Sequence, residues 1–112
     1  MSTVLRSAVP AFWLAIAVSG FTGCGPSRQQ QGEDLFEVNC ADCHETPNPD
    51  LKKQPPKLEG LFDAKTLPSG AAATDEQVRK TIIQGLRTMP AFDGRLSESD
   101  VQDLIRYLHT LR

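Results

Sequence analysis

Two stretches in the second half of the chain place apolar residues at helical spacing. The stretch after Thr74 repeats them every fourth position, and the stretch after Ser97 repeats them every third or fourth position until the chain ends. Residues at this spacing share one face of a helix, so each stretch predicts an amphipathic helix. The two predicted stripes consist of Val78, Ile82 and Leu86 in the first stretch, and of Val101, Leu104, Ile105, Leu108 and Leu111 in the second.

The signals for helix ends agree with these stripes. The letters "TDEQ" have the form of a capping box, with Thr74 at the cap and an amide side chain three residues later. Gly85 is suited to end the same helix. The letters "SESD" predict that the last helix starts near Ser97 or Ser99.

A further helix is predicted from Gly32, where Leu35, Phe36 and Val38 lead toward Cys40 and give apolar positions on one side of a short helix. The five prolines between positions 45 and 69 exclude a long helix or a central strand there. No segment shows strand alternation of comparable quality. The predicted fold class is therefore all-α, with about three main helices joined by Pro-rich loops.

The beginning of the chain has the pattern of a signal peptide. One positive charge, Arg6, precedes the run "AFWLAIAVSGF", which has the length of a signal-peptide core and is short for a membrane span. We therefore expect export, with residues 1–23 as the signal peptide, 24–31 as a flexible Gln-rich tether and 32–112 as the folded domain.

The sequence at the end of the apolar run, "FTGCG", resembles the lipobox of bacterial lipoproteins. The resemblance implies that Cys24 is lipidated and becomes the first residue of the mature chain. The alternative is ordinary cleavage nearby, which leaves Cys24 as a spare thiol in an oxidising compartment.

Charge and size narrow the function classes. The whole chain has a net charge of −2, and loss of Arg6 with the signal peptide leaves 11 basic against 14 acidic residues, or −3. This slightly acidic net charge predicts neither a nucleic-acid-binding surface nor a polybasic patch for membranes. A domain this small often needs a metal, a disulfide or a cofactor to supplement its core.

The stretch "NCADCHET" carries the candidate chemistry. Cys40, Cys43 and His44 form C-x-x-C-H, the attachment signature of c-type haem, in which two thiols bond the haem vinyl groups and the imidazole binds iron. A structural zinc site would need a fourth ligand from Cys24 or His109, in the tether and at the chain end. A redox dithiol would need a βαβ context, and a structural disulfide leaves the histidine unexplained. The motif favours haem.

A haem iron held by His44 has a second axial position, which Met89 is suited to fill. Met1 leaves with the signal peptide, so Met89 is the remaining thioether, in the loop "TMPAF" between two predicted helices. Such a ligand raises the reduction potential and favours electron transfer. The alternatives are Met89 as core filler and His109 as the ligand, although His109 falls beside the apolar stripe and is expected to be exposed to solvent.

From Gly32 to the C-terminus the sequence resembles the small monohaem, His/Met-ligated cytochromes c of class I. In "GEDLFEVNCADCH", Gly32, Phe36 and Cys40 match the family's first helix, which packs against the C-terminal helix. The expected partners there are Leu104 and Tyr107.

Two further segments carry the resemblance. "PPKLEGLF" implies that the backbone carbonyl of Pro56 accepts a hydrogen bond from His44, which would fix the imidazole as a ligand. "TMPAF" matches the family's axial-methionine loop at Met89. The resemblance implies a cytochrome c fold wrapped around one covalent haem c.

The implied function is one-electron transfer between redox protein partners, in the periplasm or on the periplasmic side of a bacterial membrane. A lipid anchor at Cys24 would hold the domain at that membrane. Two other classes stay open at this point. They are a haem enzyme or gas sensor with a displaceable Met89, and a haem-free metal or disulfide module.

Overall fold

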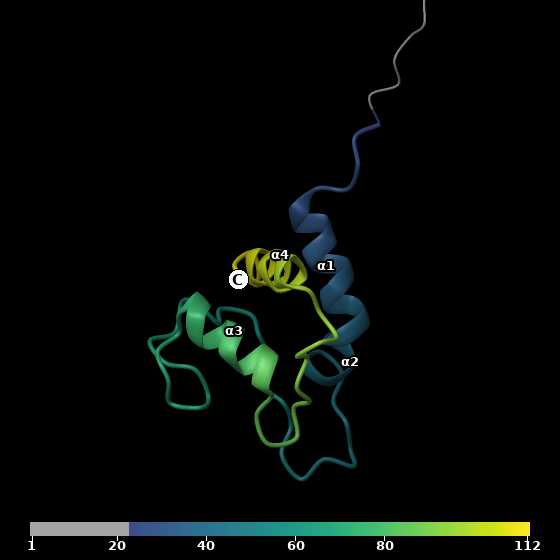
Figure 1. Ribbon diagram of the computed structural model, residues 1–112. Helices are drawn as coiled ribbons and strands as arrows, with labels where there is room; N and C mark the ends of the chain where they lie inside the picture. Colours follow the sequence, from purple (N-terminus) through teal and green to yellow (C-terminus); the bar gives the residue numbers. More distant parts are fainter. Residues whose placement is uncertain (1–22) are drawn as a thin grey trace, which may run out of the picture.

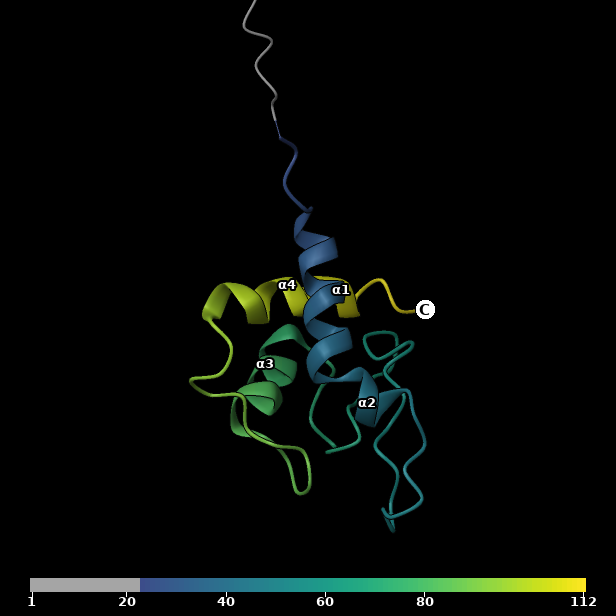
Figure 2. The ribbon, with the colours of Figure 1, turned by 90° about the vertical axis from the view of Figure 1, so that its right-hand side faces the viewer.

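The computed structural model describes residues 23–112 and shows three longer helices and one short helix (Figures 1 and 2). The predicted signal peptide, apart from Gly23, lies outside the described residues. Within 23–112, strand-type pairing is confined to two isolated bridges, Thr66 with Ala72 and Leu86 with Met89. The helices are α1 (Arg28–Asn39), α2 (Ala41–His44), α3 (Asp75–Gln84) and α4 (Glu98–Leu108).

Helices α1 and α4 cross closely, as Figures 1 and 2 show. A Cβ atom added at Gly32 would lie 2.1 Å from the carbonyl oxygen of Asp103 and 2.9 Å from the Cβ of Tyr107. Only glycine permits this approach of two helix backbones. One turn further along α1, Phe36 packs against Tyr107 with ring centroids 5.3 Å apart. The helix crossing expected from the sequence is thus present.

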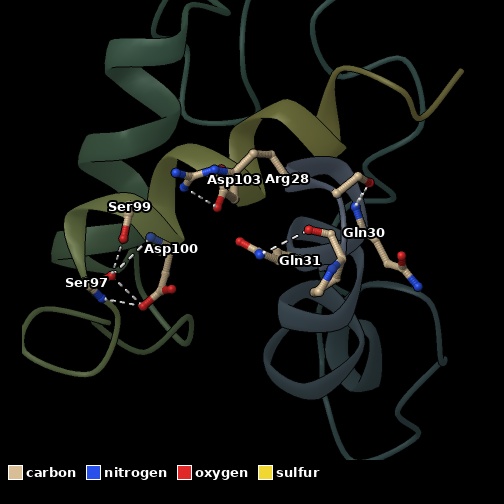
Figure 3. A network of polar contacts seen from close by, with 9 residues as sticks. Arg28, Gln30, Gln31, Ser97, Ser99, Asp100 and Asp103 are labelled. Carbon is tan, nitrogen blue, oxygen red and sulfur yellow. Dashed lines mark hydrogen bonds and ion pairs between the residues drawn. The ribbon is translucent and has the colours of Figure 1, made fainter. Parts of the chain in front are cut away.

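Helix α1 begins at Arg28, four residues before the predicted start at Gly32. The hydroxyl of Ser27 accepts a hydrogen bond from the backbone N–H of Gln30, which caps the helix. Arg28 also donates to the carboxylate of Asp103, whose residue is only 3% exposed (Figure 3). Residues 28–31, half of the segment predicted as a tether, are therefore helical, because Arg28 at the start of α1 is bound to α4.

Helix α3 has the predicted cap, in which Thr74 accepts from the backbone N–H of Gln77. Val78 and Ile82 are buried as expected. Leu86, the third member of the predicted stripe, lies outside the helix and is 42% exposed. The reason is Gly85, which ends α3 with a φ of 73° and turns the chain away.

Helix α4 starts with a capping box in which Ser97 and Asp100 bond each other's backbone N–H groups (Figure 3). The Ser97 hydroxyl also donates to the Asp100 carboxylate at 2.6 Å, and this bond, together with the one from the Ser97 backbone N–H, lowers the pKa of the Asp100 carboxyl. The predicted stripe forms the centre of the core, except that Leu111 lies beyond the helix and is half-buried. The core consists of Phe36, Leu67, Val78, Ile82, Phe92, Val101, Leu104, Ile105 and Leu108.

The Pro-rich segment between α2 and α3 is a long loop, as predicted. The backbone N–H of Gly60 donates to the carbonyl of Leu111 at 2.9 Å, which ties the loop to the C-terminal end. Leu67 enters the core, and its N–H donates to Ala71 at 2.7 Å. None of the helices described in 23–112 is long and apolar enough to cross a membrane.

Candidate functional site

Helix α2 carries the motif and directly follows α1. Cys40 separates the two helices, and its carbonyl accepts from the N–H groups of Cys43 and His44 at 3.1 and 2.9 Å. Cys40 is half-buried against the core, whereas Cys43 is exposed. The two thiols are not joined to each other, so both are available for bonding a third group.

The environment of Cys40 argues against a redox dithiol. Burial, and then the neighbouring Cys43, raise the pKa of the Cys40 thiol to about 11. Reactive C-x-x-C cysteines have a lowered pKa, because the thiolate is the nucleophile. At neutral pH Cys40 therefore stays a protonated thiol, which makes it a poor centre for disulfide exchange.

The imidazole of His44 is held by the Pro-rich loop. Its Nδ1 lies 2.7 Å from the backbone carbonyl oxygen of Pro56, twelve residues away, which makes Nδ1 the donor in that hydrogen bond. The other nitrogen, Nε2, is then the one that carries a free lone pair. A carbonyl partner of this kind fixes the ring and strengthens the histidine as a metal ligand.

Met89 lies in the loop that follows α3. The backbone groups of Leu86 and Met89 pair in both directions at 2.9 and 3.2 Å, which closes a tight two-residue turn. The N–H of Phe92 then donates to Ile82 in α3 at 3.0 Å, so the loop folds back along the helix. A Cβ atom at Gly85 would lie 2.6 Å from the carbonyl oxygen of Met89, which shows how closely this loop packs.

Cys40 and Met89 border the same hydrophobic core, although they are 49 positions apart in the sequence. Helix α2 adds Cys43 and His44 beside Cys40, so these residues, together with Met89, offer one imidazole nitrogen, one thioether sulfur and two free thiols. That set fits a covalently attached haem with two axial ligands. In the described part of the chain, no three His, Cys, Asp or Glu side chains gather as a metal site.

His109 is exposed, as predicted from its place beside the apolar stripe. Its Nε2 lies 2.7 Å from the Asp75 carboxylate, and its ring stacks on Phe62 with centroids 3.7 Å apart. Sequence reasoning missed both contacts, since they join three segments distant in the chain. They hold the end of α4 to the start of α3 and the Pro-rich loop.

Comparisons with known proteins decide the family. Residues 27–108 match the family described as cytochrome c oxidase, cbb3-type, subunit III. The chain is 32% identical over 79 residues to cytochrome c6 of Bumilleriopsis filiformis, covering 70% of this chain and 86% of that protein. The chain belongs to the cytochrome c family.

A second relative and a solved structure support the same family. Cytochrome c6 of Porphyra purpurea is 30% identical over 84% of this chain and 82% of its own length. The crystal structure of cytochrome c6 from the diatom Phaeodactylum tricornutum superposes with a TM-score of 0.55 at 28% identity, covering 71% of this chain and 88% of that one. The predicted all-α cytochrome c fold is confirmed.

Membership of this family settles the coarse function. This cytochrome c is an electron-transfer protein rather than an enzyme, it carries one covalently bound haem c, and its partners are redox proteins. The haem enzyme and the haem-free module that the sequence left open are therefore set aside.

Proposed function

We propose that Cys40 and Cys43 bond the haem covalently, and that His44 and Met89 are the axial ligands of its iron. The observation that carries the proposal is the hydrogen bond of 2.7 Å between Nδ1 of His44 and the carbonyl of Pro56. It occupies one ring nitrogen and leaves the other for a metal. When bound, the haem supplies a reversible one-electron couple.

The protein residues would contribute attachment, orientation and shielding. Cys40 and Cys43 lie one helical turn apart, a spacing that suits two bonds to one ring. Gly85 lets the Met89 loop pack tightly against the end of α3, which restrains the thioether. Cys40 and Met89 border the apolar core, and a soft sulfur ligand favours electron transfer over chemistry on oxygen.

The double variant Cys40→Ser/Cys43→Ser tests the attachment. It should yield a chain whose haem separates from the polypeptide in acidic organic solvent, because no thioether bond remains. The wild-type chain should retain its haem under the same extraction. The variant Cys24→Ser is the matched control and should retain haem like the wild type. Haem retained by the double variant would remove both cysteines from the proposed role.

We further propose that this cytochrome serves a bacterial electron-transfer chain in the periplasm and that Cys24 anchors it by a lipid. Cys24 is exposed, and only residues 25–27 separate it from helix α1. Three residues extend over roughly 10 Å at most. An anchor at Cys24 would therefore hold the domain close to the bilayer, with less freedom to swing than an eight-residue tether gives.

Mass spectrometry of the mature N-terminus tests the anchor. The expected result is a chain that begins at Cys24 and carries acyl chains, since more than one is needed for stable membrane attachment. A chain that begins elsewhere, or one whose Cys24 is a free thiol, would contradict the lipid anchor and leave the haem assignment untouched.

A further inference from the structure

Arg87 has an unusual backbone conformation at the tip of the turn closed by Leu86 and Met89. Its φ is 56°, and it is the only residue other than glycine with a positive φ among the described residues 23–112. The first tip position of such a two-residue turn favours glycine, because a side chain there is strained. An arginine in this position therefore costs stability.

No interaction within the described part of the protein compensates for this cost. Three arginines have side-chain partners in the described residues: Arg28 pairs with Asp103, Arg79 pairs with Glu98, and Arg95 lies over the ring of Phe92. Arg87, in contrast, is exposed and takes part in no ion pair or side-chain hydrogen bond in 23–112. Strain that is retained without an internal contact points to a role outside the folded domain.

The surroundings of Arg87 indicate what that role is. Leu86, its neighbour in the turn, is one of two large apolar residues described as exposed. Of the three basic residues in 77–92, Arg79 is paired with Glu98, so among the described residues Lys80 and Arg87 keep unpaired charges, and Asp93 follows the segment. Residues 29–51 contain six acidic residues and no Lys or Arg. The turn before Met89 is therefore positive at its tip, and the segment that carries His44 is negative.

Tyr107 of α4 lies near the acidic side chains of this segment. Burial, and then the carboxylates of Glu33, Glu45 and Glu37, raise the pKa of Tyr107. None of these three carboxylates is paired with a base among the described residues. The two sides of the molecule thus differ in charge, although the net charge is small.

We propose that Leu86 and Arg87 form the contact for a redox partner whose surface is acidic around an apolar spot. Opposite charge would guide the partner to the Met89 loop, and the exposed leucine would fill the apolar spot once the two proteins touch. Redox encounters are small and short-lived, so two side chains at the tip of one turn are a sizeable share of such an interface. The proposal goes beyond the assignment of the haem ligands, and it rests on that assignment for placing the haem beside the Met89 loop.

Oxidants of opposite charge test the proposal on the holoprotein. The reduced protein gives one electron to hexacyanoferrate(III), an anion, which becomes hexacyanoferrate(II), or to tris(phenanthroline)cobalt(III), a cation, which becomes the cobalt(II) complex. We compare Arg87→Gln with Arg106→Gln, which removes the same charge from an exposed position in α4. Figures 1 and 2 both show α4 at the end of the domain opposite the turn after α3.

At about 0.01 M salt, Arg87→Gln should lower the rate constant with hexacyanoferrate(III) at least about threefold and leave the cobalt rate unchanged or higher. Arg106→Gln should change either rate much less, and Arg87→Lys should restore the anion rate at an unchanged reduction potential. Equal losses in the two Gln variants would mean that only net charge matters and would overturn the proposal.

The variant Arg87→Gly separates charge from strain. It should lose the same anion rate as Arg87→Gln yet unfold at a higher denaturant concentration, because glycine relieves the positive φ. An Arg87→Gly protein no more stable than Arg87→Gln would show that the arginine carries no strain cost, which would remove the reason for assigning it a role.

Discussion

Gly32→Ala is expected to lower the free energy of unfolding of the holoprotein by about 3 kcal/mol. The new Cβ would lie 2.1 Å from the carbonyl oxygen of Asp103 and 2.7 Å from its carbonyl carbon, so α1 and α4 must move apart. That movement loosens Phe36, which is 2% exposed and packs on Tyr107. Denaturant titration followed by helical circular dichroism measures the change.

The sign of this effect is informative. In a helix without a close neighbour, replacing glycine by alanine stabilises the fold by roughly 1 kcal/mol. Gly25→Ala is a control for the change of residue type away from the helix crossing, because Gly25 precedes α1 and a Cβ there has nothing within 4 Å. Gly32→Ala with unchanged or higher stability would contradict the close crossing of the two helices.

Met89→Ala is expected to lower the reduction potential by more than about 100 mV, a fraction of the roughly 0.8 V that axial ligands span. Loss of the thioether would remove the proposed soft ligand, which favours ferrous iron, and it should let the protein bind cyanide or azide much faster. Potentiometric titration and ligand-binding kinetics measure the two effects.

Met89→Leu separates ligation from packing. It keeps a similar volume against the core that Met89 borders, and it lacks sulfur. We expect a potential as low as in Met89→Ala with smaller loss of stability. Leu86→Ala, in the same turn, is the control and should leave the potential close to that of the wild type. A wild-type potential in Met89→Leu would reduce Met89 to a packing residue.

The elements that the sequence predicted well depend on local chemistry. Thr74 and Ser97 cap their helices with their own side chains, and Gly85 ends α3 by its own backbone freedom. Such signals act within one helical turn. The same holds for the buried stripe of α4, whose spacing alone identifies the face that packs.

The features that the sequence missed depend on contacts between distant segments. The start of α1 at Arg28 is supported by Asp103, 75 positions away, and no sequence pattern near Arg28 indicates that partner. The stacking of Phe62 on His109 likewise requires the path of the Pro-rich loop. A local pattern carries no information about such pairs.

The features of the candidate site likewise include some that local sequence patterns predict and some that they do not. C-x-x-C-H is a compact motif and was found from spacing alone. The hydrogen bond of His44 to Pro56 was expected only from the family resemblance, because five prolines leave the path of the loop undetermined by local rules. The positive φ of Arg87 had no signal in the sequence, where a glycine or asparagine would have been typical.

The absorption spectrum of the oxidised holoprotein tests the central claim most directly, because it reports the axial ligands of the iron that Cys40, Cys43, His44 and Met89 are proposed to hold. We predict the weak long-wavelength band of ferric iron bonded to methionine sulfur, present in the wild type and absent in Met89→Leu. A wild-type spectrum without that band would contradict ligation by Met89, and with it the proposed pair of His44 and Met89.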